Sequence, residues 1–225
     1  MRSGSLRDGQ QASIHRIYNA LSRPFRKARM QALHSRLGLT PSMTVLDVGG
    51  TIFNWSLAPV VPRLTLLNRG PRPADLPSGV AYIQGDARRM DQIDDGSFDL
   101  VYSNSVIEHL GTWGGQQLMA REVARVGRAF FVQTPDRRFP VEPHLLTPFI
   151  HYLPRKVQYH LVRNGTVWGL LTRPSVHRSE AFLREIRLLS RQELQLLFPD
   201  AVIFSERFLG MSKSLVAFRH LKESP

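Results

Sequence analysis

The sequence predicts an α/β fold in which a mostly parallel, seven-stranded sheet ends in an antiparallel C-terminal hairpin. Five short apolar segments between residues 43 and 133 are each followed by a turn or a helical pattern, as in a parallel sheet with crossover connections. Two further β-rich segments near the C-terminus are separated only by a turn that contains Gly210. The length of 225 residues, 42% of them hydrophobic and 21% charged, suits one large soluble domain.

The first 40 residues are expected to form a basic helical arm. Apolar residues recur at helical spacing over residues 14–21, and Pro24 is expected to interrupt the helix. An amphipathic pattern resumes over residues 25–37 and ends at Gly38.

The main domain is expected over residues 41–225. Its predicted strands are residues 43–48, 63–67, 80–83, 98–102, 129–133, 201–208 and 214–219. Its predicted helices are residues 106–110, 116–126 and 191–198. Residues 134–190 are rich in Pro, His and aromatic residues, so we expect an ordered but irregular lid inserted before the last two strands.

The net charge of +12 is concentrated in two segments. Residues 1–36 hold eight Lys and Arg against one acid, and residues 155–191 hold eight against two. These segments suggest an anionic partner or substrate, or alternatively a basic surface that keeps the protein soluble. The absence of cysteine excludes disulfides, thiolate metal ligands and cysteine nucleophiles. There is no secretory signal and no apolar run of the roughly 20 residues that span a bilayer, so a cytoplasmic location is expected.

Three motifs follow one another in the order of a known family. They are residues 45–50 (VLDVGG), 82–87 (YIQGDA) and 97–110 (SFDLVYSNSVIEHL). Together they resemble class I S-adenosylmethionine-dependent methyltransferases, and the third resembles the branch called methyltransferase type 11. The resemblance implies a Rossmann-like fold and S-adenosyl-L-methionine as cofactor.

The cofactor is expected at the carboxyl edge of the sheet, where such folds bind ligands. Glycines after the first strand let the backbone approach the methionine part, and acids at strand ends can accept hydrogen bonds from its amino groups. The residues to which the resemblance assigns this role are Asp47, Gly49, Gly50, Asn68, Asp86, Ala87 and Ser103. Simple capping of a turn or a loop is the alternative for the two acids.

Two departures from the family pattern bear on this site. Thr51 follows the glycine pair where further glycines are usual, and the second strand ends in Asn68 where an acid usually holds the ribose. An amide still hydrogen-bonds a diol, although more weakly than a carboxylate does. The same departures count against a dinucleotide cofactor, because the turn does not have the sequence GxGxxG and the acidic residue that would hold the ribose is missing.

His109 and His144 are the candidate catalytic residues, each a potential base for an acceptor hydroxyl. We expect both to point into one cavity, with Asp86 nearby; a structural role for either imidazole is the alternative. Some metal-dependent relatives carry Glu-x-x-Glu-His where this chain has Glu108-His109. Because Ser105 replaces the first Glu, no metal is expected.

The predicted function is therefore methyl transfer from S-adenosyl-L-methionine to an oxygen of a small-molecule, glycan or lipid-linked acceptor, with anionic acceptors favoured by the basic segments. The fourth strand ends in Ser-Asn-Ser and lacks the Asn/Asp-Pro-Pro-Tyr/Phe motif of enzymes that methylate nucleic-acid amines. Nucleic acid is thus a less favoured partner, and 2′-O-methylation of RNA ribose is the alternative. A non-catalytic protein with a degenerate cofactor site and a basic membrane-binding or partner-binding face is a third hypothesis.

Overall fold

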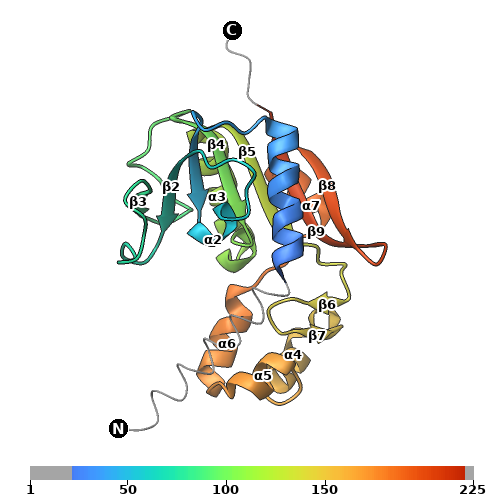
Figure 1. Ribbon diagram of the computed structural model, residues 1–225. Helices are drawn as coiled ribbons and strands as arrows, with labels where there is room; N and C mark the ends of the chain where they lie inside the picture. Colours follow the sequence, from blue (N-terminus) through green and yellow to red (C-terminus); the bar gives the residue numbers. More distant parts are fainter. Residues whose placement is uncertain (1–21, 221–225) are drawn as a thin grey trace.

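The computed structural model describes residues 22–220 and centres on one seven-stranded sheet (Figure 1). The strand order is β3-β2-β1-β4-β5-β9-β8. The strands are β1 (Thr44–Val48), β2 (Arg63–Asn68), β3 (Ala81–Gln84), β4 (Phe98–Asn104), β5 (Gly127–Pro135), β8 (Val202–Phe208) and β9 (Met211–Arg219). Strands β1 to β5 are parallel, β9 runs antiparallel to β5, and β8 runs antiparallel to β9. The predicted fold class is confirmed, including the antiparallel C-terminal hairpin.

Strand β1 lies at the point where the strand order reverses. Val48, its last residue, pairs with Leu67 of β2 on one side and Ser103 of β4 on the other. The carboxyl ends of β1, β2 and β4 therefore meet at one edge of the sheet. In open α/β sheets a ligand binds at this switch point.

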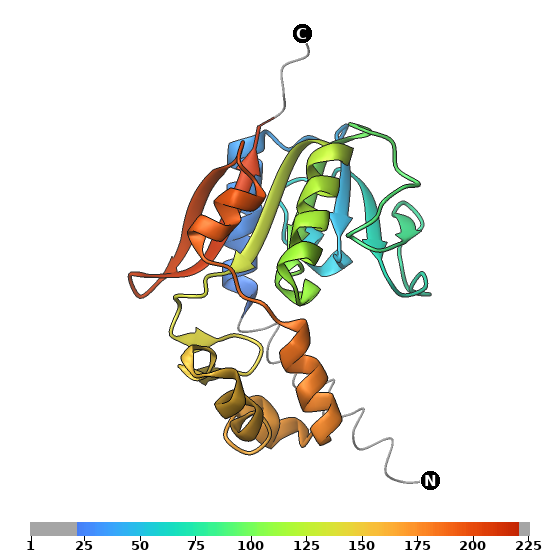
Figure 2. The same cartoon turned by 180° about the vertical axis from the view of Figure 1, so that it is seen from behind.

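Helices cover both faces of the sheet (Figures 1 and 2). Helical residues 22–37 pack on one face, and α3 (Trp113–Val126) and α7 (Arg191–Leu197) pack on the other. Neighbouring β1 residues enter the two separate cores: Val45 packs with the N-terminal helix and Leu46 packs with α3. Burial on both faces explains why the strands read as continuous apolar runs.

The N-terminal helix departs from the prediction at one residue. Pro24 was expected to interrupt it, but residues 22–37 are helical throughout. The ring of proline fixes φ at a helical value, so the residue is compatible with a helix that does not need its N–H. Residues 1–21, over which the first part of the arm was predicted, lie outside the described residues.

Between β5 and α7, residues 136–190 form an insert at the carboxyl edge of the sheet. It contains β6 (Val141–Glu142), β7 (Thr147–Pro148), the short 3-10 helix η2 (Ile150–Tyr152), α4 (Arg155–Leu161), α5 (Val167–Thr172) and α6 (Val176–Glu185). The prediction of an irregular segment was wrong, because side chains of Thr166 and Ser175 cap α5 and α6 and so begin regular helices. Among the described residues, no helix has the length and apolar character needed to cross a membrane.

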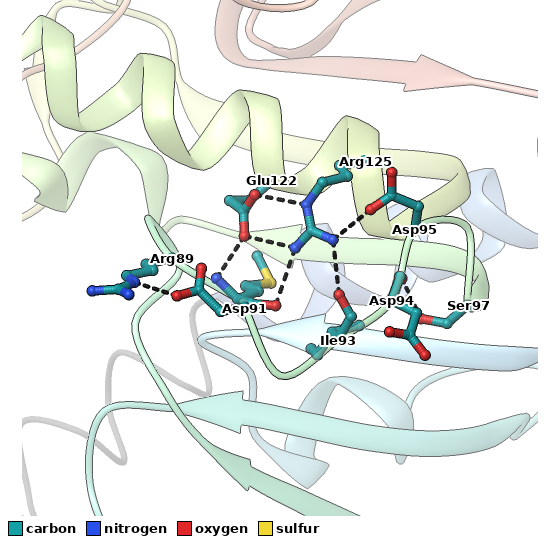
Figure 3. A network of polar contacts seen from close by, with 9 residues as sticks. Arg89, Asp91, Ile93, Asp94, Asp95, Ser97, Glu122 and Arg125 are labelled. Carbon is teal, nitrogen blue, oxygen red and sulfur yellow. Dashed lines mark hydrogen bonds and ion pairs between the residues drawn. The ribbon is translucent and has the colours of Figure 1, made fainter.

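Arg125 of α3 anchors the loop between β3 and β4 (Figure 3). Its guanidinium donates to the carbonyl oxygens of Ile93 and Met90 at 2.8 and 3.0 Å, and to Asp95 at 2.7 Å. Both carboxylate oxygens of Glu122 accept from the same group, at 2.8 and 2.9 Å. These hydrogen bonds raise the pKa of Arg125, and they hold in place the loop that begins at the third-strand motif.

Candidate functional site

A cavity of about 570 Å³ opens at the carboxyl edge of β1, β2 and β3. Its lining includes Gly49, Asn68, Asp86, Ala87, Ser105 and His109. Arg184 and Glu185, from the end of α6, form part of the same wall. The volume lies in the range of sites that bury a cofactor-sized molecule.

The turn after β1 depends on two glycines. Gly49 has a φ of +72°, and a Cβ there would lie 2.4 Å from Cγ2 of Val106. A Cβ on Gly50 would lie 1.8 Å from Oδ2 of Asp47, whose carboxyl is fully buried beneath the turn. Burial raises the pKa of Asp47 to about 7, although Trp55 Nε1 donates to Oδ2 at 2.8 Å. Of these residues only Gly49 and Val106 line the cavity, so Asp47 and Gly50 shape the turn from below.

Asn68 and Ser103 were both predicted to contact the cofactor, and the structure places them differently. Asn68 lines the cavity, and its Nδ2 donates to the carbonyl oxygen of Gly50 at 3.0 Å, which ties β2 to the turn. Ser103 is fully buried, and its Oγ donates to the carbonyl oxygen of Val48 at 3.1 Å. Ser103 therefore stabilises the end of β1 and does not line the cavity.

Asp86 lies in the cavity wall next to Ala87, paired with an arginine that sequence reasoning missed. The Nε and Nη2 atoms of Arg88 donate to its two carboxylate oxygens at 3.0 and 2.6 Å. These bonds lower the pKa of Asp86 to about 2, so the group is ionised at neutral pH. The signal in the sequence that could have indicated this ion pair is an acid followed by an arginine two residues later.

A buried polar cluster adjoins the cavity at His109. Glu108 is fully buried; Thr134 Oγ1 donates to its Oε2 at 2.9 Å, while its Oε1 has no hydrogen-bond partner in the described chain. That Oε1 lies 3.9 Å from Nε2 of His144, whose Nδ1 is 2.7 Å from Oε1 of Glu142. The rings of His109 and His144 meet edge to face, with centroids 4.7 Å apart. The insert thus brings Glu142 and His144 to residues that follow β4.

Only one of the two candidate histidines reaches the cavity. His109 lines it, whereas His144 packs against His109 and is not a lining residue, so the prediction of a shared cavity was wrong for His144. Desolvation, and then the positive charge of His144, lower the pKa of His109 to about 4. Burial lowers the pKa of His144, but its hydrogen bond to Glu142 and the charges of Glu142 and Glu108 outweigh burial and raise it overall.

The same cluster offers a donor set for a metal. One ligand atom each from Glu108, His109 and His144 lies within 4.8 Å of the others. Imidazole and carboxylate donors suit several divalent ions, and Thr134 and Glu142 already orient two of the three side chains. The expectation of no metal rested on Ser105 alone. The spacing of residues in the sequence does not show that the folded insert places His144 next to Glu108 and His109.

Beside the first cavity is a second one of about 230 Å³, and Ser105 lines both. Its lining is basic and apolar, with Arg26, Arg29 and Lys213 beside Phe139 and Leu146. Sequence reasoning noted the basic residues of the N-terminal arm but did not place any of them at the site. Their position depends on long-range packing between the arm, the insert and β9.

Comparison with known proteins gives a family match over about a third of the chain. Residues 60–129 match the family model described as a methyltransferase domain. No curated protein matches the sequence. The family match and the sheet order together make the chain similar to class I S-adenosylmethionine-dependent methyltransferases of the type 11 branch.

Solved structures of low sequence identity share the fold. One match is to a chain in a Haloferax volcanii complex of the Trm112 methyltransferase activator and a methyltransferase. It includes 97% of this protein and 98% of that chain (14% identity, TM-score 0.57). A second match, to the Burkholderia thailandensis 1,6-didemethyltoxoflavin-N1-methyltransferase with bound S-adenosylhomocysteine, includes 95% of this protein and 85% of that chain (14% identity, TM-score 0.55). For an S-adenosylmethionine-dependent methyltransferase of Thermotoga maritima the shares are 92% and 94% (15% identity, TM-score 0.56). At such identities the comparisons establish the fold and leave the acceptor open.

Proposed function

We propose that this methyltransferase transfers the methyl group to a hydroxyl oxygen of a small-molecule, glycan or lipid-linked acceptor. The observation that carries the proposal is that His109 lines the 570 Å³ cavity together with Ser105 and Gly49 of the glycine turn. A hydroxyl must lose its proton as it is methylated, and an imidazole in contact with the acceptor can take that proton. The second cavity shares Ser105 and adds Arg26 and Lys213, whose charges support an anionic acceptor, while its Arg29 is already paired with Glu206.

The residues at the strand ends fit the cofactor. Gly49 presents bare backbone at a positive φ to the cavity, so the methionine part can approach the main chain there. Asn68 offers an amide to the ribose, and Asp86 with Ala87 offers a carboxylate and a small apolar surface to the adenine. When bound, S-adenosyl-L-methionine supplies a methyl group on a sulfonium, which is open to in-line displacement.

The remaining chemistry belongs to residues of this chain. We assign to His109 the role of the base that contacts the acceptor. His144 is a positioning residue: its ring packs edge to face against His109, and Glu142 fixes its orientation through Nδ1. Holding the acceptor and the base in place is the main source of catalysis in a reaction of this kind.

The test is transfer of a tritiated methyl group to cell-extract fractions sorted into glycan, lipid, small-molecule and RNA pools. We expect label in one of the first three pools, and a loss of about 10²- to 10⁴-fold in turnover for His109→Ala at unchanged affinity for S-adenosylhomocysteine. Asp86→Ala should do the reverse, weakening S-adenosylhomocysteine about ten- to a hundredfold.

Two results would contradict the proposal. Label confined to the RNA pool would favour ribose methylation instead. Turnover abolished by EDTA and restored by a divalent ion would show that a metal is needed, for which Glu108, His109 and His144 are the candidate ligands, and would argue against His109 as the base.

A further inference from the structure

The outer end of the insert exposes apolar and basic side chains together. Residues 143–179 contain five Lys or Arg and no Asp or Glu. We use the term insert tip for the exposed surface of α4, α5 and the first turn of α6, which lie away from the sheet (Figures 1 and 2). Its exposed apolar residues are Val157, Leu161, Val167, Leu170, Leu171 and Val176.

The apolar residues of α5 are held outward by the packing of its other face. Gly169 lies so close to the preceding loop that a Cβ on it would be 2.2 Å from the carbonyl oxygen of Val162. Trp168 stacks on Phe182 of α6, with ring centroids 4.5 Å apart. Leu170 and Leu171 follow directly and remain 61% and 51% exposed, and Val176 at the start of α6 is 59% exposed. Large apolar side chains exposed this close together along the chain are typical of an interaction surface.

The basic residues of the insert tip have no acidic partners. Lys156, Arg163, Arg173 and Arg178 are all exposed, and none forms an ion pair with a carboxylate within residues 22–220. Elsewhere on the insert the exposed Arg184 does pair, with Glu180 at 3.3 Å. The tip therefore combines unpaired positive charge with an apolar centre.

We propose that the insert tip binds the surface of a membrane that contains anionic lipids. Leu170, Leu171 and Val176 would enter the boundary between headgroups and acyl chains, while the cations meet the lipid phosphates. A nucleic acid offers phosphates but no apolar surface to cover the leucines. A second copy of this chain would place the same unpaired positive charges opposite one another. The inference goes beyond methyl transfer, because it needs neither cofactor nor turnover.

The test is co-sedimentation of the full chain with phosphatidylcholine vesicles, with and without phosphatidylglycerol. We expect binding to the vesicles that contain phosphatidylglycerol, weakened by salt. The pair Leu170→Ser and Leu171→Ser should weaken it about tenfold or more, since each side chain loses a large part of its apolar contact. The pair Lys156→Glu and Arg178→Glu should remove the preference for phosphatidylglycerol.

Leu196→Ser is the matched control, because Leu196 of α7 is 73% exposed and lies outside the insert. It should bind vesicles as the natural chain does, and thermal melts should show all variants folded. Absence of vesicle binding at low salt, or an equal loss in Leu196→Ser, would overturn the proposal. So would a dimer in sedimentation velocity that the leucine pair dissociates, or retention of an RNA homopolymer, if either occurred without vesicle binding.

Discussion

Two missing Cβ atoms allow the turn after β1 to lie between Val106 and the buried carboxyl of Asp47. The space that Gly49 leaves is taken by Val106, and the space that Gly50 leaves is taken by Asp47. The sequence predicted a close approach of backbone to cofactor here. In the structure the glycine backbone instead lies closest to side chains of the protein, those of Val106 and Asp47, and the cavity lies beside the turn.

Gly49→Ala should therefore impair both folding and cofactor binding. The new Cβ meets Val106 at 2.4 Å, and the positive φ alone costs about 1–2 kcal/mol for an L-residue. We expect a lower melting temperature and an affinity for S-adenosylhomocysteine reduced about tenfold or more, measured by calorimetry. Gly79→Ala is the control, because a Cβ there has no atom within 4 Å and should leave both quantities unchanged.

Asp47 should make stability depend on pH. Its pKa is raised from 3.8 to about 7 in the folded chain, so the unfolded state loses its proton first as the pH rises. The free energy of unfolding should fall between about pH 4 and pH 7, by up to about 4 kcal/mol, and then stay level with respect to this group. In Asp47→Asn, which keeps an oxygen for the Trp55 hydrogen bond, that fall should be absent in urea titrations. The control Asp75→Asn, at an exposed residue, should show the same fall as the natural chain. If the free energy of unfolding falls equally in Asp47→Asn, the pH dependence belongs to other groups.

At the scale of elements, predictability follows from local signals. The strands were predictable because the sheet is buried on both faces, which makes each strand a short apolar run bounded by turns. Gly49, Asn68 and Asp86 could be placed because they follow such strands. The helices of the insert were missed because α4 and α5 are short and carry apolar residues on their exposed sides. The position of His144 depends on how the whole insert folds, which no local pattern reveals.

Arg125 should be the side chain that fixes the loop after β3 to α3 (Figure 3). Arg125→Leu removes its donors to Met90, Ile93 and Asp95 and leaves Glu122, only 17% exposed, without its cation. We expect a loss of about 2–4 kcal/mol in the free energy of unfolding and faster amide exchange across residues 86–97.

Arg121→Leu provides the comparison for this variant. Arg121 lies on the same helix, is exposed and forms no hydrogen bond or ion pair within residues 22–220, so its loss should cost less than about 0.5 kcal/mol. Equal destabilisation by the two variants would show that the network around Arg125 does not hold the loop.

At the scale of the molecule, the insert has a core of its own. Leu145, Ile150, Val162 and Leu183 form a cluster separate from the two cores on the faces of the sheet. The two ends of the insert lie side by side, because Asp136 and Leu189 form a β-bridge and Arg137 N donates to the carbonyl oxygen of Leu189 at 3.0 Å. The chain can thus be divided into a sheet that we propose binds the cofactor and an insert that we propose contributes to acceptor activation and membrane contact.

Replacing residues 141–183 with a Gly/Ser linker of about eight residues should leave a folded domain, since the linker needs to span only the short distance from the bridged ends. This deletion keeps Arg184 and Glu185, which line the cavity, and removes His144 and the insert tip. We expect S-adenosylhomocysteine still to raise the melting temperature, while methyl transfer and vesicle binding are both lost. The same linker inserted after the exposed Gly70 should spare all three properties. A truncated chain that folds but no longer binds S-adenosylhomocysteine would show instead that the insert completes the cofactor site.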